Sequence, residues 1–397
     1  MKTLRPLAEH ELPAFLDQVA RSFSGSRWPP EDVQRVVQAI ELERAIGVFE
    51  DGTLVATAAA QSMQLTVPGG SAPAVGIGRV SVLPTHRRQG LLTEMMRHLV
   101  AEARDRGEPL AALFSSEGGI YGRFGFGVAT YEADVRVQRA RSAFRSRAEG
   151  AGLRLVQPVE AADTLARIAG VVTDGQPGAV RRGREWWRFQ AAAPQQPGEP
   201  EWQVVVRAQQ DGFVVYRTHG HLRPPALEGG SLEVGPLFAV SPQAYAALWR
   251  YCLDVDLMDE VTARHRSVDE PLRHLLADPR AMECTAWDGL WLRLVDVEAA
   301  LRARRYARAD RLVLHIEDGF CPWNTGTYAL EAGEPRRVTE PPDLVLPTDA
   351  LGACYLGGNR FVALASAGVV AERVPGAAAR ADVVFASPLT PWCPYHF

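Results

Sequence analysis

The sequence predicts an α/β (α+β) protein with two mixed-sheet segments, the second a degenerate copy of the first, followed by a smaller α+β segment. Apolar residues alternate with period 2 in some stretches and recur with the helical period in others. Turn signals at Asp51-Gly52 and Asp211-Gly212 each separate two strand-like runs. The chain has 397 residues, 47% of them hydrophobic, which suits two or three cores. We expect domains at residues 1–145, 146–284 and 285–397.

The first segment carries helix and strand signals in an order typical of a mixed sheet. Gly107 is a natural end for its longest helix, and the last of its strands shows the polar–apolar alternation of an antiparallel strand. The expected elements are a helix at 12–23, two strands within 44–67, a strand at 74–84, a helix at 91–107, and strands at 109–116 and 128–138.

The later segments contain shorter versions of these patterns. Residues 140–153 are rich in Arg, Ala and Gly and predict a linker. After a hairpin within 201–220, a strand leads into a helix with Ser241 as its cap and Pro242 as its first residue. The third segment is expected to contain a strand–helix step within 286–306, a hairpin-like pair within 311–330, and further elements within 347–372.

Composition excludes several classes of partner. The net charge is −4 and the isoelectric point is about 6.2, so no attraction to nucleic acid or to an anionic membrane is expected. The first residues have no apolar run behind their positive charge, and no stretch is apolar enough to span a bilayer. The five widely spaced cysteines predict reduced thiols in a cytoplasm. No metal is expected: H-E-x-x-H is absent, and His219 and His221 are interpreted as an exposed pair.

The strongest chemical signal is "VSVLPTHRRQGLL", residues 80–92. A strand ends at Pro84, a basic loop with Arg87 and Arg88 follows, and a helix begins near Gly90. Backbone N–H groups at a helix N-terminus bind anions, and glycine lets a phosphate approach the backbone closely. A solvated arginine-rich turn is the alternative, but the flanking strand and helix favour a phosphate site. The nearby "GIGRVS" precedes a strand and is not a dinucleotide fingerprint.

A second signal is "SSEGGIYGRFGFG", residues 115–127, which follows a buried strand. Its five glycines surround Tyr121, Phe124 and Phe126. The alternative is a hairpin whose aromatic residues pack in the core. Because this strand end lies beside the phosphate-binding step, two strands could splay there and admit a ligand, which makes Tyr121 a candidate acid.

Together these motifs resemble the Eis (enhanced intracellular survival) family of GNAT N-acetyltransferases. The resemblance is most specific at 80–92, 115–127, 286–300 and the aromatic C-terminus "PWCPYHF". It implies two GNAT-like domains, the second degenerate, a C-terminal sterol-carrier-like domain, and a homohexamer. It also implies acetyl-CoA as cosubstrate, bound by Val80, Ser81 and Val82 at the acetyl and pantetheine end, by Arg88, Gln89, Gly90, Leu91, Leu92 and Thr93 at the pyrophosphate, and by Ser116 and Glu117 at the next strand end.

The resemblance further implies Tyr121 as general acid and the α-carboxylate of Phe397 as general base. A terminal carboxylate has an ordinary pKa of about 3.3–3.7, and we expect burial against Trp392 and Tyr395 to raise it. The backbone N–H near Val82 could stabilise the oxyanion, and a tyrosine could protonate the departing thiolate.

The predicted function is acetyl-CoA-dependent N-acetylation of primary amines on small cationic molecules, with aminoglycosides acetylated at more than one position. The alternatives are a protein-lysine or polyamine acetyltransferase and a lipid-binding carrier protein. Phe23 and Trp28 could line the substrate entrance, as aromatic residues in the corresponding region of the family do. The alternative is a purely structural role, in which Phe23 packs in a helix interface and Trp28 anchors a loop.

Overall fold

The structure is a computed structural model that describes residues 2–23, 40–147, 152–191, 199–220, 222–223, 226–227 and 229–397. The chain forms two compact units. The first unit comprises Met1–Thr130, Leu290–Leu389 and His396–Phe397, and the second comprises Tyr131–Gly289 and Thr390–Tyr395. Each unit therefore draws on separate stretches of sequence, and the last residues of the chain are divided between the two.

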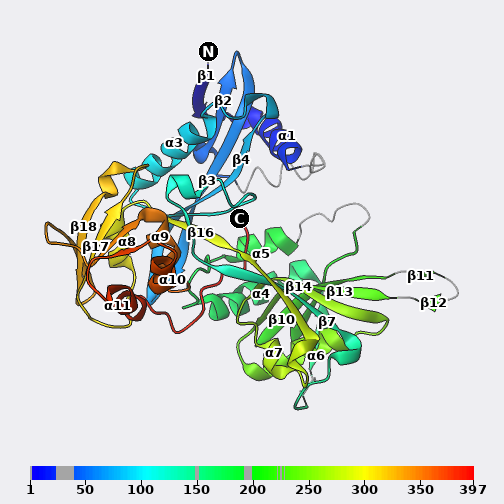
Figure 1. Cartoon of the computed structure of the whole chain (residues 1–397). Coiled ribbons are helices and arrows are strands. Elements are labelled where there is room, and N and C mark those ends of the chain that lie inside the picture. The colour runs from blue at the N-terminus through cyan, green and yellow to red at the C-terminus, as the bar shows by residue number, and fades with distance from the viewer. Residues whose placement is uncertain are drawn as a thin grey trace. The chain divides into compact units, whose positions relative to one another are not determined.

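The first unit contains a seven-stranded sheet of order β1-β2-β3-β4-β5-β16-β6 (Figure 1). Strands β4 and β5 pair in parallel, and the other neighbouring strands pair antiparallel. Helices α1 (Leu12–Ser22) and α3 (Leu91–Asp105) lie on opposite faces of this sheet. The strands are β1 (Lys2–Pro6), β2 (Ala45–Glu50), β3 (Thr53–Val67), β4 (Gly70–Val82), β5 (Leu110–Phe114), β6 (Gly127–Val128) and β16 (Leu290–Leu294).

Local signals explain most of this sheet. Asp51 and Gly52 both have positive φ, 48° and 82°, as a tight hairpin turn between β2 and β3 requires. Helix α3 buries its predicted apolar side and ends just before Gly107, which has φ of 72°. Its buried side chains, Leu91, Met95, Met96, Leu99, Val100 and Ala103, join the core that also contains strands β2 to β5.

A five-stranded sheet of order β19-β18-β17-β20-β21 completes the first unit. It is formed by β17 (Leu312–Glu317), β18 (Gly326–Glu331), β19 (Glu334–Val338), β20 (Leu344–Pro347) and β21 (Ala371–Glu372), with helices α8 (Val297–Ala303), α9 (Thr348–Cys354), α10 (Phe361–Ser366) and α11 (Ala377–Val384). Helix α9 packs directly against β16 and β6. A side chain on Gly127 would collide with the carbonyl of Asp349, and one on Gly352 with that of Leu292, so two glycines permit this approach.

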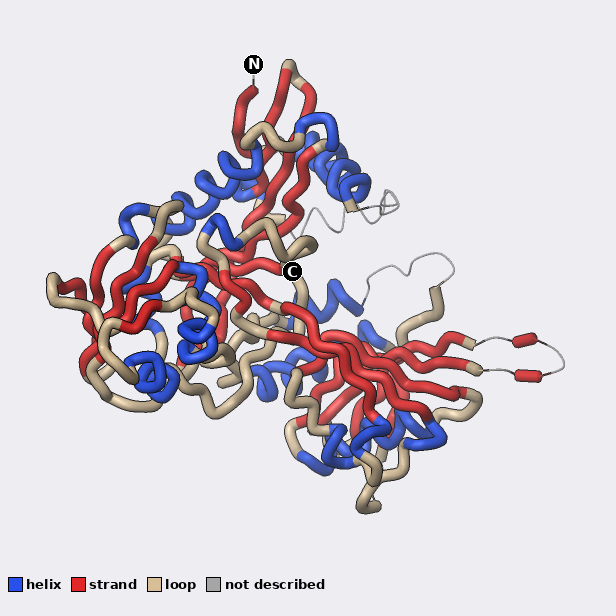
Figure 2. Tube along the Cα trace, viewed as in Figure 1, coloured by secondary structure: helices blue, strands red, loops and turns tan. Residues whose placement is uncertain are grey.

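The second unit has its own seven-stranded sheet, of order β15-β7-β14-β13-β10-β9-β8 (Figure 2). Strands β13 and β14 pair in parallel, and Ser241 caps α6 by accepting a hydrogen bond from the N–H of Ala244 (3.2 Å), as predicted. The strands are β7 (Tyr131–Gln138), β8 (Leu153–Val156), β9 (Gln203–Arg207), β10 (Gly212–His219), β13 (Gly230–Ala239), β14 (Met258–Ser267) and β15 (Met282–Asp288). The helices are α4 (Pro158–Thr173), α5 (Arg184–Ala191), α6 (Pro242–Asp254) and α7 (Leu272–Leu275), and β11 (Leu222–Arg223) pairs with β12 (Ala226–Leu227).

Two strands lie in different sheets from those expected. The strand predicted at 128–138 is expected in the sheet of the first segment, but β7 pairs with β14 and β15 in the second unit. The strand that opens the third segment, β16, instead pairs with β5 in the first sheet. Period-2 alternation identifies a strand and its buried face but does not identify its partner, so only the three-dimensional structure reveals this exchange.

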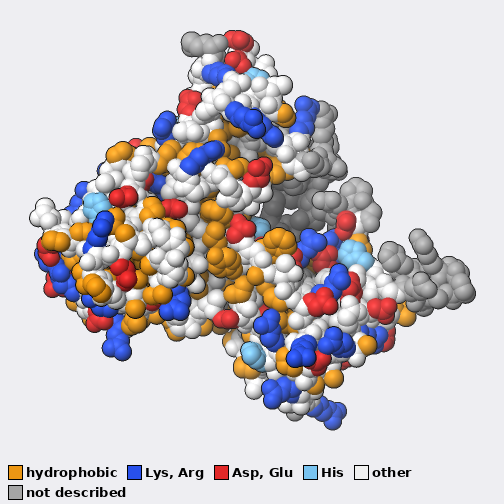
Figure 3. Space-filling view, in the orientation of Figure 1, with side chains coloured by type: hydrophobic (Ala, Val, Ile, Leu, Met, Phe, Trp, Pro, Cys, Tyr) orange, Lys and Arg blue, Asp and Glu red, His pale blue; other side chains and the backbone are white. Residues whose placement is uncertain are grey.

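The surface agrees with the charge expected from composition. On the face seen in Figure 3, basic and acidic side chains are interspersed. No helix among the described residues has the length and hydropathy needed to cross a membrane.

Candidate active site

The candidate site lies in the first unit, where the parallel strands β4 and β5 separate. Their pairing runs from Ala74 opposite Leu110 to Gly76 opposite Ala112 and then stops. Beyond that point β4 continues to Val82 and β5 to Phe114. In open α/β sheets, ligands bind in a crevice at the carboxyl ends of strands. The strands therefore diverge at the place the sequence predicts.

A bulge in β4 shapes one side of this opening. The register with β3 shifts between Gly78 and Ser81, and Arg79, within the bulge, has φ of 52°. The Thr57 hydroxyl holds the bulge by donating to the carbonyl of Arg79 (3.1 Å) and by bonding the hydroxyl of Ser81 (2.7 Å). The side chain of Ser81 is buried there and also accepts a hydrogen bond from Gln18 (3.3 Å). Ser81 thus has a visible structural role in fixing the backbone of Val80–Val82.

The backbone of Val82 faces the opening. The N–H of Leu83 donates to the carbonyl of Val55 (3.0 Å), and Val82 lies opposite Ala56 in the same ladder. Hydrogen-bonded and non-hydrogen-bonded pairs alternate along antiparallel strands. The N–H of Val82 therefore points away from β3, toward the side on which β5 has diverged. It is placed to donate to an oxygen in the opening.

The loop after β4 ends in the uncapped start of α3. Gly90 precedes the helix with φ of 84°, and a side chain added there would meet no atom within 4 Å. Glu94 donates the first intrahelical bond, to the carbonyl of Gly90 (3.1 Å). The preceding N–H groups, those of Leu91, Leu92 and Thr93, point out of the helix, as they do at any helix start. Such a terminus suits a phosphate.

Several contacts fix this loop in place. His86 bonds Glu50 (2.8 Å), and the side chain of Gln89 contacts Lys2 and the carbonyl of Thr85 (3.3 Å). Arg88 has φ of 62° and an exposed side chain. The predicted pyrophosphate residues thus lie consecutively in this loop and the first turn of α3, with the side chain of Arg88 exposed.

The loop after β5 carries Tyr121. Ser116 and Glu117 are exposed at its start, where the hydroxyl of Ser115 and the N–H of Ile120 both donate to the carbonyl of Glu117 (2.8 and 3.1 Å). Tyr121 is 7% exposed and joins the core that includes Val75 and Ile77 of β4. Burial, and secondarily the charge of Glu117, raise the pKa of Tyr121, so its hydroxyl keeps its proton at neutral pH.

The C-terminal residue lies on the other face of β4. A methyl group on Gly76 would come within 2.8 Å of the Phe397 ring, and one on Gly78 would lie 3.4 Å from its terminal oxygen. The Phe114 ring stacks on His396, with centroids 3.9 Å apart, and meets Phe397 edge-on at 5.2 Å. Since neighbouring residues of a strand face opposite sides, Phe397 packs on the face of β4 opposite to that of Val75 and Ile77.

The comparisons with known proteins agree with this geometry. Residues 3–129 and 178–302 each match a family described as acetyltransferase (GNAT) domain, and residues 297–394 match a sterol carrier protein domain. An uncharacterized N-acetyltransferase of Streptomyces avermitilis is 39% identical over 407 residues, 99% of each chain. N-acetyltransferase Eis of Mycobacterium tuberculosis is 35% identical, over 86% of this chain and 85% of its own.

The chain belongs to the Eis family of GNAT N-acetyltransferases. The crystal structure of Eis1 from Mycobacterium abscessus superposes on this Eis-family chain with a TM-score of 0.87 at 34% identity, covering all of both chains. The predicted fold class, two GNAT domains and a sterol-carrier-like domain, is thereby confirmed, as is N-acetyltransferase activity. The three contiguous domain boundaries stay a prediction.

Sequence reasoning missed the brace behind Tyr121. Arg293, fully buried on β16, donates to the carbonyl of Phe124 in the Tyr121 loop and to Asp318 (2.6 Å). Asp318 in turn accepts hydrogen bonds from the N–H of Cys321 (2.8 Å) and the amide of Asn324 (3.0 Å). The sterol-carrier-like part of this Eis-family chain thus holds the Tyr121 loop through a buried ion pair. An arginine inside the otherwise apolar run "LWLRLV" was the available signal.

The remaining predicted residues are dispersed. Phe23 follows α1 and is 52% exposed, so it does not pack in a helix interface. Trp28 lies outside the described residues, as does His221. His219 bonds Glu233 (3.1 Å). Trp392 and Tyr395, expected beside the terminal carboxylate, are buried in the core of the second unit.

Proposed function

We propose that this Eis-family enzyme transfers the acetyl group of acetyl-CoA to primary amines of small cationic molecules, with aminoglycosides acetylated at more than one amine. The observation that carries the proposal is the opening between β4 and β5. The uncapped start of α3 follows one of the diverging strands, and the chain terminus packs against both of them.

The proposed cosubstrate fits the residues that form this opening. The N–H groups of Leu91, Leu92 and Thr93 and the guanidinium of Arg88 would bind the pyrophosphate, with Gln89 and Gly90 shaping the loop around it. The backbone of Val80, Ser81 and Val82 would accompany the pantetheine and acetyl group, and Ser116 and Glu117 would flank it at the end of β5. Acetyl-CoA supplies the thioester that the amine attacks.

The proposed chemistry uses three groups of the chain. The Phe397 carboxylate attracts the ammonium group and accepts its proton, directly or through a water, so that the neutral nitrogen can attack the thioester carbonyl. The Val82 N–H donates to the carbonyl oxygen as it gains negative charge. When the carbon–sulfur bond breaks, the Tyr121 hydroxyl gives its proton to the thiolate and recovers one from the attacking nitrogen. The products are an amide, the free thiol of CoA and one proton released to solvent.

The interior of the third domain favours the acetyltransferase function over the alternative of a lipid-binding carrier protein. Arg304 is 3% exposed there and donates to the carbonyls of Tyr355 and Phe385 (2.9 Å for Phe385). Its guanidinium lies 4.6 Å from the centroid of the Phe385 ring and 4.8 Å from that of Tyr306. A cation occupies the space among these aromatic rings, which does not favour a hydrocarbon chain.

The proposal is tested by measuring thiol release from acetyl-CoA with an aminoglycoside, a polyamine and a lysine peptide as acceptors. The expected result is turnover with aminoglycosides, and mass spectrometry should find more than one acetyl group on the product. If the peptide or the polyamine is turned over faster than the aminoglycoside, that molecule represents the preferred substrate class and the aminoglycoside assignment is wrong. Absence of both turnover and CoA binding would refute the proposal as a whole.

Assembly and location are part of the same proposal. We expect a homohexamer in the cytoplasm, acting without a metal ion and without a nucleic acid or membrane partner. The five cysteines are present as free thiols, which suits a reducing compartment. Sedimentation at the mass of six chains would support the assembly, and activity that persists in EDTA would support metal-independent chemistry.

A further inference from the structure

The aromatic residues just before the C-terminus form part of the core of the second unit. Trp392 and Tyr395 are 9% and 4% exposed. The Tyr395 ring centroid lies 4.9 Å from that of Trp186, 5.8 Å from that of Trp187 and 5.7 Å from that of Phe238. Aromatic contacts of this kind contribute energy beyond the burial of apolar area. The segment Thr390–Tyr395, called here the tail segment, is therefore an integral part of this unit.

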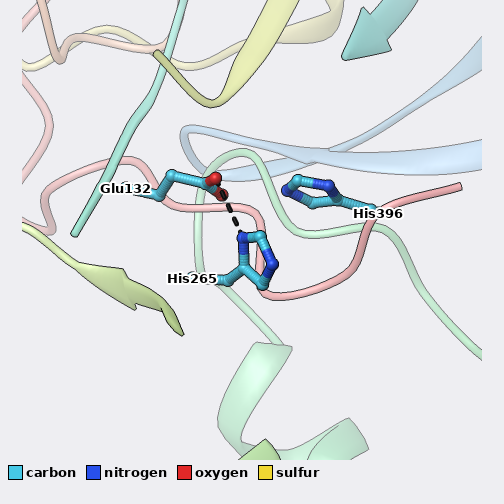
Figure 4. A group of neighbouring side chains, drawn as sticks. All are labelled: Glu132, His265 and His396. Carbon is cyan, nitrogen blue, oxygen red and sulfur yellow. Dashed lines mark hydrogen bonds and ion pairs between the residues drawn. The ribbon is translucent and has the colours of Figure 1, made fainter. Parts of the chain in front are cut away.

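Directed hydrogen bonds fix the same segment. Gln176 donates to the carbonyl of Thr390 (2.8 Å), and the N–H of Trp392 donates to the carbonyl of Pro177 (2.8 Å). The indole N–H of Trp392 donates to the carbonyl of His265 (2.9 Å). The side chain of His265 is itself held by Glu132 at 2.9 Å, and this contact raises the pKa of His265 (Figure 4).

An arginine stacks between the tail segment and the body of the unit. The guanidinium carbon of Arg266 lies 5.5 Å from the centroid of the Trp392 ring and 5.7 Å from that of the Trp249 ring. Arg266 donates to Glu270 (2.8 Å) and to the carbonyl of Leu237 (3.3 Å). Burial lowers the pKa of Arg266 to about 10, so the group is still a cation at neutral pH. A buried cation between two indole rings is a strong and geometrically specific contact.

We propose that the second unit anchors the C-terminus, with Trp392 and Arg266 as positioning residues for the carboxylate of Phe397. Only His396 and Phe397 follow Tyr395, and each residue spans at most about 3.6 Å, so the position of the tail segment limits where the terminal carboxylate can lie. The inference rests on the proposed function insofar as that carboxylate is the base. It gives the degenerate GNAT-like domain, which lacks the phosphate-binding glycine and arginines, a role of its own.

The anchor is tested first without any acetyl transfer. Carboxypeptidase A removes aromatic C-terminal residues, and intact-mass measurement follows the loss of Phe397 over time. Trp392→Leu and Arg266→Met should release Phe397 at least about 10-fold faster than the unmodified chain, because the tail segment opens more often. Arg250→Met is the matched control: it removes a guanidinium of the same unit that stacks on Phe144 (4.8 Å) and bonds Ser142 (2.7 Å). Equal release from all four proteins would overturn the anchor.

The positioning role is tested by kinetics on the same variants. Trp392→Leu and Arg266→Met should lower kcat by about 10- to 100-fold, because small displacements of a catalytic group cost this much. The dissociation constant for CoA should not change. Trp392→Phe and Arg266→Lys keep a ring and a cation and should recover most of kcat. Faster release of Phe397 with unchanged kcat would overturn the positioning role.

The two proposals fail in different ways. If the unmodified chain acetylates no amine, the proposed function is wrong, while the release of Phe397 still decides whether the second unit holds the tail. If the chain is active and Arg250→Met lowers kcat as much as Arg266→Met does, the effect comes from general loosening of the unit and the anchor is overturned. Circular dichroism and thermal unfolding of each variant identify any that do not fold.

Discussion

Tyr121 and Phe397, the proposed acid and base, are held in the molecule by two different devices. Tyr121 lies on a short loop after β5, packed in the core and braced by the Arg293–Asp318 pair of the same unit. Phe397 and His396 follow a six-residue segment, Thr390–Tyr395, that belongs to the second unit. The acid is positioned by its local fold, whereas the base depends on docking of the chain end.

This difference predicts which changes would displace the Tyr121 hydroxyl and which would displace the Phe397 carboxylate. A loop between two strands that both pair with β16, with a buried ion pair behind it, is displaced only when part of the core opens. A chain terminus has one covalent connection and frays unless tertiary contacts hold it. Changes at the chain end should therefore abolish activity without unfolding the protein, and changes behind Tyr121 should affect folding and activity together.

The largest effect should come from moving the terminal carboxylate. One glycine appended after Phe397 shifts the carboxylate by one residue and should lower kcat by about 10³-fold, within the range for loss of a general base. The measurement is steady-state thiol release, with CoA affinity determined separately. Phe397→Leu is the matched control because it keeps the carboxylate at the same position. If the appended glycine leaves kcat unchanged, the terminus is not the base.

The next effect tests the brace behind the acid. Asp318→Ala leaves the Arg293 guanidinium buried without its carboxylate and should lower the free energy of unfolding by about 3 kcal/mol or more. Glu331→Ala removes the partner of Arg336, an exposed pair at 3.0 Å, and should cost about 0.5 kcal/mol or less. Urea unfolding measures both. Equal costs for the two variants would show that the buried pair is not a brace.

A smaller effect is expected at the acid itself. Tyr121→Phe keeps the packing but removes the proton donor, and kcat should fall about 10²-fold. Because burial raises the pKa of Tyr121, the unmodified enzyme should keep its acid protonated beyond pH 10. The free energy of unfolding also depends on this group. The contribution of Tyr121 is fully present below about pH 10 and is lost as the pH rises further, because the unfolded state releases the tyrosine proton before the folded state does.

Profiles of kcat against pH for the unmodified enzyme and Tyr121→Phe test whether Tyr121 stays protonated up to pH 10. The unmodified enzyme should show no loss of kcat assignable to Tyr121 below pH 10. A fall in kcat near pH 8 that disappears in Tyr121→Phe would mean that the hydroxyl ionises early, which contradicts the burial seen in the structure.

How much the sequence could predict depends on the range of the interactions involved. The turn at Asp51-Gly52, the helix predicted at 91–107 and the strand–loop–helix order of residues 80–92 follow from local signals; the structure contains the turn, a helix at Leu91–Asp105, and that order of elements. The exchange of β7 and β16 between sheets, the position of Trp392, and the pairing of Arg293 with Asp318 depend on contacts between residues far apart in the chain. Periodicity and residue type carry no information about such partners.

The smallest effect separates backbone strain from ligand binding on a single helix. Gly90 and Gly107 flank α3, have φ of 84° and 72°, and have no atom within 4 Å of an added methyl group. Alanine at either position should cost about 1–2 kcal/mol through the left-handed conformation alone. If the backbone at Gly90 shifts to relieve that strain, the N–H groups of the proposed phosphate site move with it.

Gly90→Ala should therefore raise the KM for acetyl-CoA by about 10-fold, because 1.4 kcal/mol corresponds to a factor of ten in an equilibrium constant. Gly107→Ala should lower the melting temperature about as much as Gly90→Ala does. It should leave the KM for acetyl-CoA unchanged, because Gly107 lies at the other end of the helix. Steady-state kinetics and thermal unfolding of the two variants provide the comparison. If both variants bind acetyl-CoA equally well, the N-terminus of α3 is not the pyrophosphate site, and the opening between β4 and β5 must take its ligand in another way.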